Sequence, residues 1–225
     1  MISDSQALLK LLQLASPALP VGGYSYSEGL ETLVQRGLTS PGAITQWLEQ
    51  ELAQGQIRAD GVGLYRVYGA AQAGCWAEVV ECNQWLSALR DSEEARQQSW
   101  AMGRALTRLI LDLQPELAEP MAVIGQPCNF AVGFGLVAAH WQIPAPAAGL
   151  AYVHNWAANL ITAAVKLVPL GQTQGQQMLL ALYPALAAAA ENWATLPWEA
   201  VTFSNWGTAL ACMQHETLYS RLFRS

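Results

Sequence analysis

The chain has 225 residues, of which 52% are hydrophobic, only 12% are charged and nine are tryptophan. Its formal net charge is −6 and its basic residues are scattered, which excludes a typical nucleic-acid-binding protein. The first residues lack the basic start of a signal peptide, and the longest apolar run, 178–190, is too short to span a bilayer. We therefore expect a cytoplasmic protein without a membrane partner, whose apolar excess lies in a large core or against protein partners.

Helical periodicity recurs along the whole chain, whereas the alternation typical of strands does not. Ser3 with Gln6 forms a capping box, and Ser40 is a cap followed by a proline suited to a first helical turn. The expected helices, in chain order, are 3 to about 15, 27–36, 41–54, 59–73, 75–89, 92–113, 130–140, 147–168, 173 to just before Pro197, and 199–216. The pattern predicts one all-α domain over 1–225, a single compact bundle of about ten helices.

The run 12–31, LQLASPALPVGGYSYSEGLE, contains more helix breakers than an ordinary linker needs. Its two tyrosines, Tyr24 and Tyr26, either pack in the core or present a ring to a partner. Glu28 and Glu31 lie three apart, which favours a solvated helix edge over an acidic contact. We keep Tyr24, Tyr26 and Glu28 as candidate partner-binding residues.

The chain has no recognisable catalytic, cofactor or metal motif. It lacks a phosphate-binding loop with its lysine, and segment 23–27 fails the G-x-S-x-G pattern of a serine nucleophile at its last position. The three histidines are isolated and the four cysteines form no C-x-x-C pair. We therefore expect no catalytic residue, no cofactor and no metal site.

The end of the chain carries the strongest interaction signal. Two apolar pairs at helical spacing and two arginines fill it: Leu218 with Leu222, Tyr219 with Phe223, and Arg221 and Arg224. Terminal segments usually fray, and arginine is frequent at binding hot spots. We expect partners to order residues 216–225, with Arg221, Leu222, Phe223 and Arg224 in contact. The alternative is that this segment docks on its own bundle.

Three segments resemble, in the right order, motifs of the urease accessory protein F family (UreF). They are the run 12–31, the segment 167–172 (LVPLGQ) and the last eleven residues, HETLYSRLFRS. The resemblance implies a non-enzymatic homodimer that recruits the urease accessory GTPase (UreG-like) and a second accessory protein (UreD, called UreH in some species). Together these proteins deliver nickel to apo-urease. Residues 129–135 depart from the family pattern, so no role is carried over to them.

Two other functions stay open at this point. One is a helical enzyme with a polar pocket inside the bundle, which requires titratable groups with perturbed pKa values. The other is a direct nickel carrier, for which His215 and the cysteines are the first ligands to consider.

Overall fold

The computed structural model describes residues 5–202 and 204–225, and these residues form helices and no strand. The all-α prediction is therefore confirmed. The α-helices are α1 (Ser5–Leu14), α2 (Leu30–Gln35), α3 (Pro41–Gln54), α4 (Gln56–Gln72), α5 (Trp76–Ala88), α6 (Glu93–Leu113), α7 (Ala118–Ile124), α8 (Phe130–His140), α9 (Ala145–Leu167), α10 (Gln172–Thr195) and α11 (Trp206–His215). Short 3₁₀ turns lie at Gly23–Ser25, Pro115–Leu117 and Trp198–Ala200.

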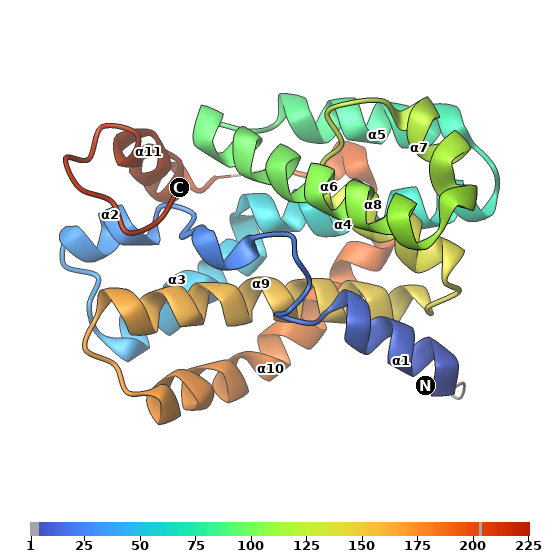
Figure 1. Cartoon of the computed structure of the whole chain (residues 1–225). Helices are drawn as coiled ribbons and strands as arrows, with labels where there is room; N and C mark the ends of the chain where they lie inside the picture. Colours follow the sequence, from blue (N-terminus) through green and yellow to red (C-terminus); the bar gives the residue numbers. More distant parts are fainter. Residues whose placement is uncertain (1–4, 203) are drawn as a thin grey trace.

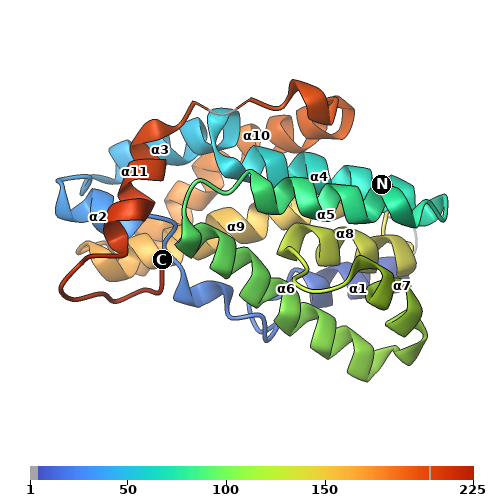
Figure 2. The same cartoon turned by 90° about the horizontal axis from the view of Figure 1, so that it is seen from above.

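The helices form two groups along the length of the molecule. Helices α5, α7 and α8 lie at one end, and α2, α3 and α11 lie at the other, in both Figure 1 and Figure 2. The long helix α9 connects the two groups and packs against α10 and α4, while α4 also packs against α8. Among the described residues, no helix is both long enough and apolar enough to cross a membrane.

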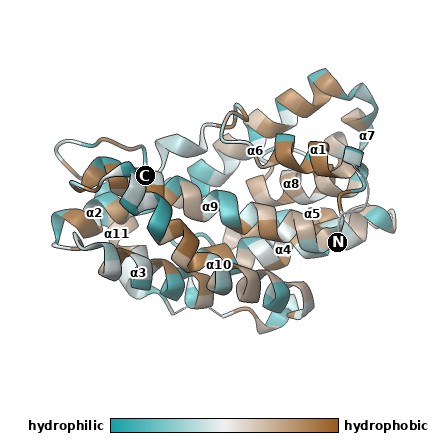
Figure 3. Cartoon of the chain, turned by 90° about the horizontal axis from the view of Figure 1, so that it is seen from below, coloured by the Kyte–Doolittle hydropathy of each residue, from teal (hydrophilic) through white to brown (hydrophobic). Residues whose placement is uncertain are grey.

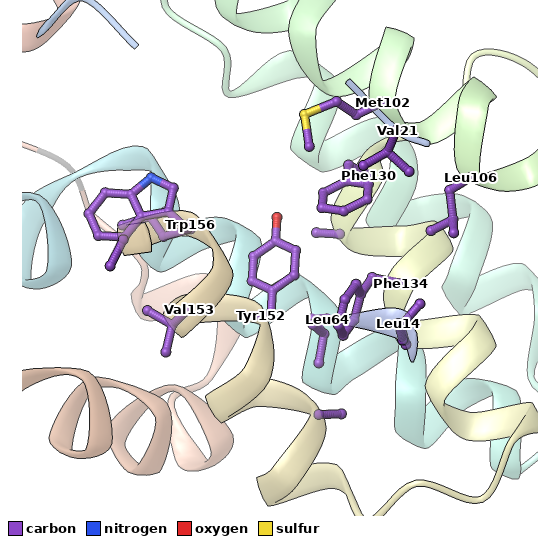
Figure 4. Close-up of a cluster of buried hydrophobic side chains, with 14 of the residues drawn as sticks. Leu14, Val21, Leu64, Met102, Leu106, Phe130, Phe134, Tyr152, Val153 and Trp156 are labelled. Carbon is purple, nitrogen blue, oxygen red and sulfur yellow. The ribbon is translucent and has the colours of Figure 1, made fainter. Parts of the chain in front are cut away.

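Helix α8 forms the centre of the apolar core. All its residues from Phe130 to Ala139 are buried, and a Cβ added to Gly135 would lie 2.7 Å from the Leu64 carbonyl oxygen of α4. The glycine thus lets two helix backbones approach closely. Figure 4 shows Tyr152 of α9 beside Phe130 and Phe134, and its ring centroid lies 5.2 Å from that of Phe134 in an edge-to-face contact.

Asn129, in the segment to which no role could be assigned, is a buried polar hub. Its amide donates to the Asn83 carbonyl oxygen at 2.9 Å and to the Ser87 hydroxyl at 2.7 Å, both on α5. The Ser99 hydroxyl of α6 donates to its side-chain oxygen at 2.9 Å. Asn129 therefore joins α5 and α6 to the start of α8, and its role in this structure is to satisfy buried polar groups.

The apolar excess is not entirely internal. Helix α1 exposes Leu8, Leu9 and Leu12, and Figure 3 shows brown residues along it. Helix α11 exposes Trp206, Leu210 and Met213, which follow one another at helical spacing.

Several expected elements have different boundaries. The helix expected at 27–36 begins only at Leu30, because Glu28 and Gly29 have positive φ angles of 52° and 81°. The helix expected at 199–216 is a 3₁₀ turn and, from Trp206, the helix α11, and the backbone at Val201 after the turn is extended. The short helix α7 was not expected, and the capping residue Ser3 lies outside the described residues.

Candidate functional site

The central part of the run 12–31 forms the connection between α1 and α2. This connection, residues 15–29, is called the junction. It contains a 3₁₀ turn at Gly23–Ser25 and left-handed backbone at Gly22, Glu28 and Gly29. A Cβ added to Gly29 would lie 3.0 Å from the Cys212 sulfur and 3.1 Å from the Cys212 backbone nitrogen. Gly29 therefore combines a conformation that L-residues avoid with a close approach to α11.

The C-terminal tail, residues 216–225, lies directly on this junction. The backbone N–H and the hydroxyl of Ser27 both donate to the Ser225 main-chain oxygen at 2.6 Å. The Arg224 N–H donates to the Ser25 carbonyl oxygen at 2.9 Å. Two segments that are 198 residues apart in sequence thus form one structural unit.

Glu31 of α2 binds two backbone groups of the tail. Its carboxylate accepts the backbone N–H groups of Leu222 at 2.8 Å and Phe223 at 3.0 Å. The side chain of Glu31 is buried, so these charge-assisted hydrogen bonds are not shared with bulk water.

His215, fully buried at the end of α11, bridges two carboxylates. Its Nε2 lies 3.1 Å from Glu31 and its Nδ1 lies 2.8 Å from Glu94 of α6. Glu94 also accepts from Arg221 of the tail at 2.9 Å. The Glu31–His215–Glu94 triad therefore connects α2, α6 and α11 with the tail.

The seven candidate partner-binding residues have different environments. The side chains of Tyr24, Arg221, Leu222 and Arg224 are exposed, with Tyr24 at 65% and Leu222 at 62%. Tyr26 and Phe223 are buried in the core, and the ammonium of Lys166 lies 5.6 Å from the Phe223 ring centroid. Both rings are already packed and are not presented to a partner in this structure, so contact with a partner through Tyr26 or Phe223 stays a prediction.

The predicted solvated edge at Glu28 and Glu31 is also wrong. Glu31 is buried by the tail, and the Glu28 carboxylate points inward, where it accepts from Gln98 at 2.8 Å and from the Trp156 indole at 2.9 Å. The helical spacing expected for the tail is not realised either, since no helix extends past His215 in the described chain. Ordering of the tail by a partner stays a prediction, although much of the tail already has intramolecular hydrogen bonds.

A partly open cavity lies beside the junction, and its empty volume of about 1140 Å³ includes space open to solvent. Its polar lining includes Glu28, Glu51, Asp60 and Arg90, together with the tail residue Ser225. Burial raises the pKa of Glu51 to about 7, against hydrogen bonds from Thr208 and Asn205 that lower it. Burial also raises the pKa of Glu28 and Asp60, although Arg90 forms an ion pair with Asp60 that opposes the effect. The cavity thus concentrates carboxyl groups whose pKa values are raised by burial.

The cavity contains no activated nucleophile among its described residues. Cys212 lines it, but burial raises the pKa of this thiol, which disfavours the reactive thiolate. No group of three or more His, Cys, Asp or Glu side chains in the described ranges has an arrangement that would hold a metal ion. Both nitrogens of His215 face carboxylates, so the histidine considered first as a ligand is already engaged.

Sequence reasoning did not find the triad or the contact between junction and tail. A signal was available in His215, a lone histidine at the end of an apolar helix. Nothing in the sequence spacing pairs it with Glu31 or Glu94. These contacts depend on the tertiary fold.

Comparison with known proteins agrees with the resemblance found in the sequence. A family model described as UreF matches residues 38–183. The chain is 51% identical over 218 residues to the urease accessory protein UreF of Nostoc sp., covering 96% of this chain and 95% of that protein. It is 47% identical over 223 residues to the urease accessory protein UreF of Microcystis aeruginosa, covering 99% of both. The chain therefore belongs to the urease accessory protein UreF family.

Proposed function

We propose that this chain is a non-enzymatic, cytoplasmic scaffold of urease maturation. It recruits the accessory GTPase and a UreD/UreH-like accessory protein, acts as a homodimer, and supports nickel insertion into apo-urease. A scaffold of this kind works by differential affinity, because it stabilises the conformation of its partner that it binds more tightly.

One observation carries the proposal. The junction and the tail form a single unit, and this unit exposes aromatic, arginine and leucine side chains. The Arg224 backbone N–H donates to the Ser25 carbonyl oxygen, so the chain at the exposed Tyr24 is one residue away from this contact with the tail. Tyr219 and Leu222 add apolar surface to the same tail. Aromatic and arginine side chains on a fixed backbone are the usual anchors of protein interfaces.

Co-purification with the accessory GTPase and the UreD/UreH-like protein tests the proposal. Arg221→Ala and Tyr24→Ala should each weaken recovery of at least one partner, whereas Arg108→Ala, an exposed arginine on α6, should not. Full recovery of both partners by both variants would remove the junction–tail unit as the binding surface.

The cavity is the one observation that favours a different function, a helical enzyme. It is concave and polar, and Glu28, Glu51 and Asp60 have raised pKa values, as a general-acid site requires. Loss of urease maturation in Glu51→Gln with intact partner binding would support this alternative. A nickel titration of the isolated chain tests the carrier alternative, for which we expect no bound equivalent.

A further inference from the structure

The tail contributes to the wall of the cavity beside the junction. Ser225 is the lining residue that the tail supplies. The other lining residues come from helices, from the junction, or from the segments that flank α6 and α11. Ser225 is 1% exposed and its hydroxyl donates to Gln98 at 2.7 Å. Gln98 in turn donates to Glu28, so the tail reaches the polar interior of the cavity through one intermediate side chain.

A small number of polar contacts hold this part of the wall. Glu31 accepts two tail N–H groups, Glu94 accepts from Arg221, and Ser27 donates twice to Ser225. Phe223 is the tail residue that also packs in the core cluster. A segment held mainly by hydrogen bonds opens locally at a much lower free energy than a packed helix.

The triad makes these contacts depend on one another. His215 faces Glu31 through one nitrogen and Glu94 through the other, and each of these carboxylates also binds the tail. Arg221 is the other charged group at Glu94, and Glu31 faces two main-chain N–H groups of the tail. Loss of one member therefore leaves a buried charge without its partner and weakens the remaining tail contacts.

We propose that the tail is a releasable wall of the cavity, and that Glu31, His215 and Glu94 form the latch that holds it closed. Release opens the cavity further to solvent and exposes more of its lining without unfolding the bundle. This device concerns the isolated chain and does not depend on partner binding.

Release would also change the charge inside the cavity. Burial is the largest cause of the raised pKa of both Glu28 and Glu51. Water entering the open cavity removes part of that effect, so both carboxyl groups ionise more readily. The position of the tail then sets how much negative charge the cavity contains.

The four cysteines provide a direct test. Cys212 lines the cavity, Cys82 and Cys128 are buried elsewhere, and Cys75 is exposed. The rate of alkylation by N-ethylmaleimide is measured for each cysteine by peptide mass spectrometry. The proteins are the wild type, a deletion of residues 221–225, and the full-length variant Glu31→Gln.

Cys212 should react about tenfold faster in the deletion, because this part of the cavity wall is missing. It should react several-fold faster in Glu31→Gln, because an amide at this position accepts only part of the hydrogen bonds that hold the tail. Cys82 and Cys128 should react at the wild-type rate, and Cys75 should react quickly in every protein. An unchanged rate at Cys212 in both variants would overturn the proposal. Equal acceleration of all three buried cysteines in both variants would also overturn it, because the tail would then support the whole fold.

Discussion

The two ends of the bundle are stabilised in different ways. Around α8, apolar side chains pack without polar exceptions from Ala131 to Ala139, and Gly135 brings α8 against α4. Around the junction and tail, buried carboxylates, the His215 imidazole and main-chain groups form long-range hydrogen bonds. At the first end, close packing tolerates little change in side-chain volume. At the second end, stability depends on charged groups and on a few directional hydrogen bonds. A partner can therefore reorganise the second end at a much smaller free-energy cost.

The largest expected effect lies at the apolar end. Gly135→Ala should lower the free energy of unfolding by about 3 kcal/mol, because its Cβ would meet the Leu64 carbonyl oxygen at 2.7 Å. Gly69→Ala is the matched control on α4, where an added Cβ meets nothing within 4 Å. That control should be neutral or stabilising by up to about 1 kcal/mol. Equal urea midpoints for the two variants would mean that α4 and α8 are not closely packed.

The second prediction concerns Glu51, whose pKa is raised from 4.5 to about 7. The folded state retains this proton between pH 4.5 and 7 while the unfolded state loses it, so burial of Glu51 lowers stability as pH rises through this window. Glu51→Gln removes this titration and should raise the free energy of unfolding at pH 8 by up to about 3 kcal/mol. The gain should shrink towards pH 4.5, and a gain of the same size at both pH values, measured by urea unfolding, would contradict the assignment.

A smaller loss is expected at the latch. Glu31→Gln should lower the free energy of unfolding by about 1–2 kcal/mol, because the amide can accept only part of the hydrogen bonds made by the carboxylate. Glu49→Gln removes the same charge from an exposed position of α3 and should change stability by less than about 0.5 kcal/mol. Thermal melting of both variants checks the difference, and equal losses would indicate an effect of net charge alone.

The smallest effect on stability is expected at Tyr24, whose side chain is 65% exposed. Tyr24→Ala should change the free energy of unfolding by less than about 0.5 kcal/mol. Tyr26→Ala, two residues further along, should cost about 2–3 kcal/mol because its ring is buried. Similar melting temperatures for the two variants would show that the junction does not separate an outer ring from an inner one.

The contrast also explains what the sequence could predict. Periodicity and caps located most helices, including the Ser40 cap, whose hydroxyl accepts from the Ala43 N–H at 3.2 Å. The apolar end follows from local pattern because the residues of α8 from Phe130 to Ala139 are all apolar or glycine, and all are buried. Positive φ at Glu28, the extended backbone at Val201 and the short helix α7 do not follow from local propensity.

The site was predicted in part. The sequence located both the junction and the tail as special segments and kept Tyr24 and Arg221 among the candidate contacts, but it did not bring the two segments together. Glu31 was expected at a solvated edge, yet it binds Leu222 and Phe223. A pairing across nearly the whole chain is fixed by the packing of α2, α6 and α11, which no local pattern contains.

The central claim is that junction and tail form one unit. Hydrogen exchange measures it through two amides, the Phe223 N–H bonded to Glu31 and the Ser27 N–H bonded to Ser225. In Glu31→Gln both amides should exchange faster than in the wild type, and by a similar factor, because the tail leaves the junction as a whole. Faster exchange at Phe223 with an unchanged rate at Ser27 would show that the two segments are independent and would contradict the account.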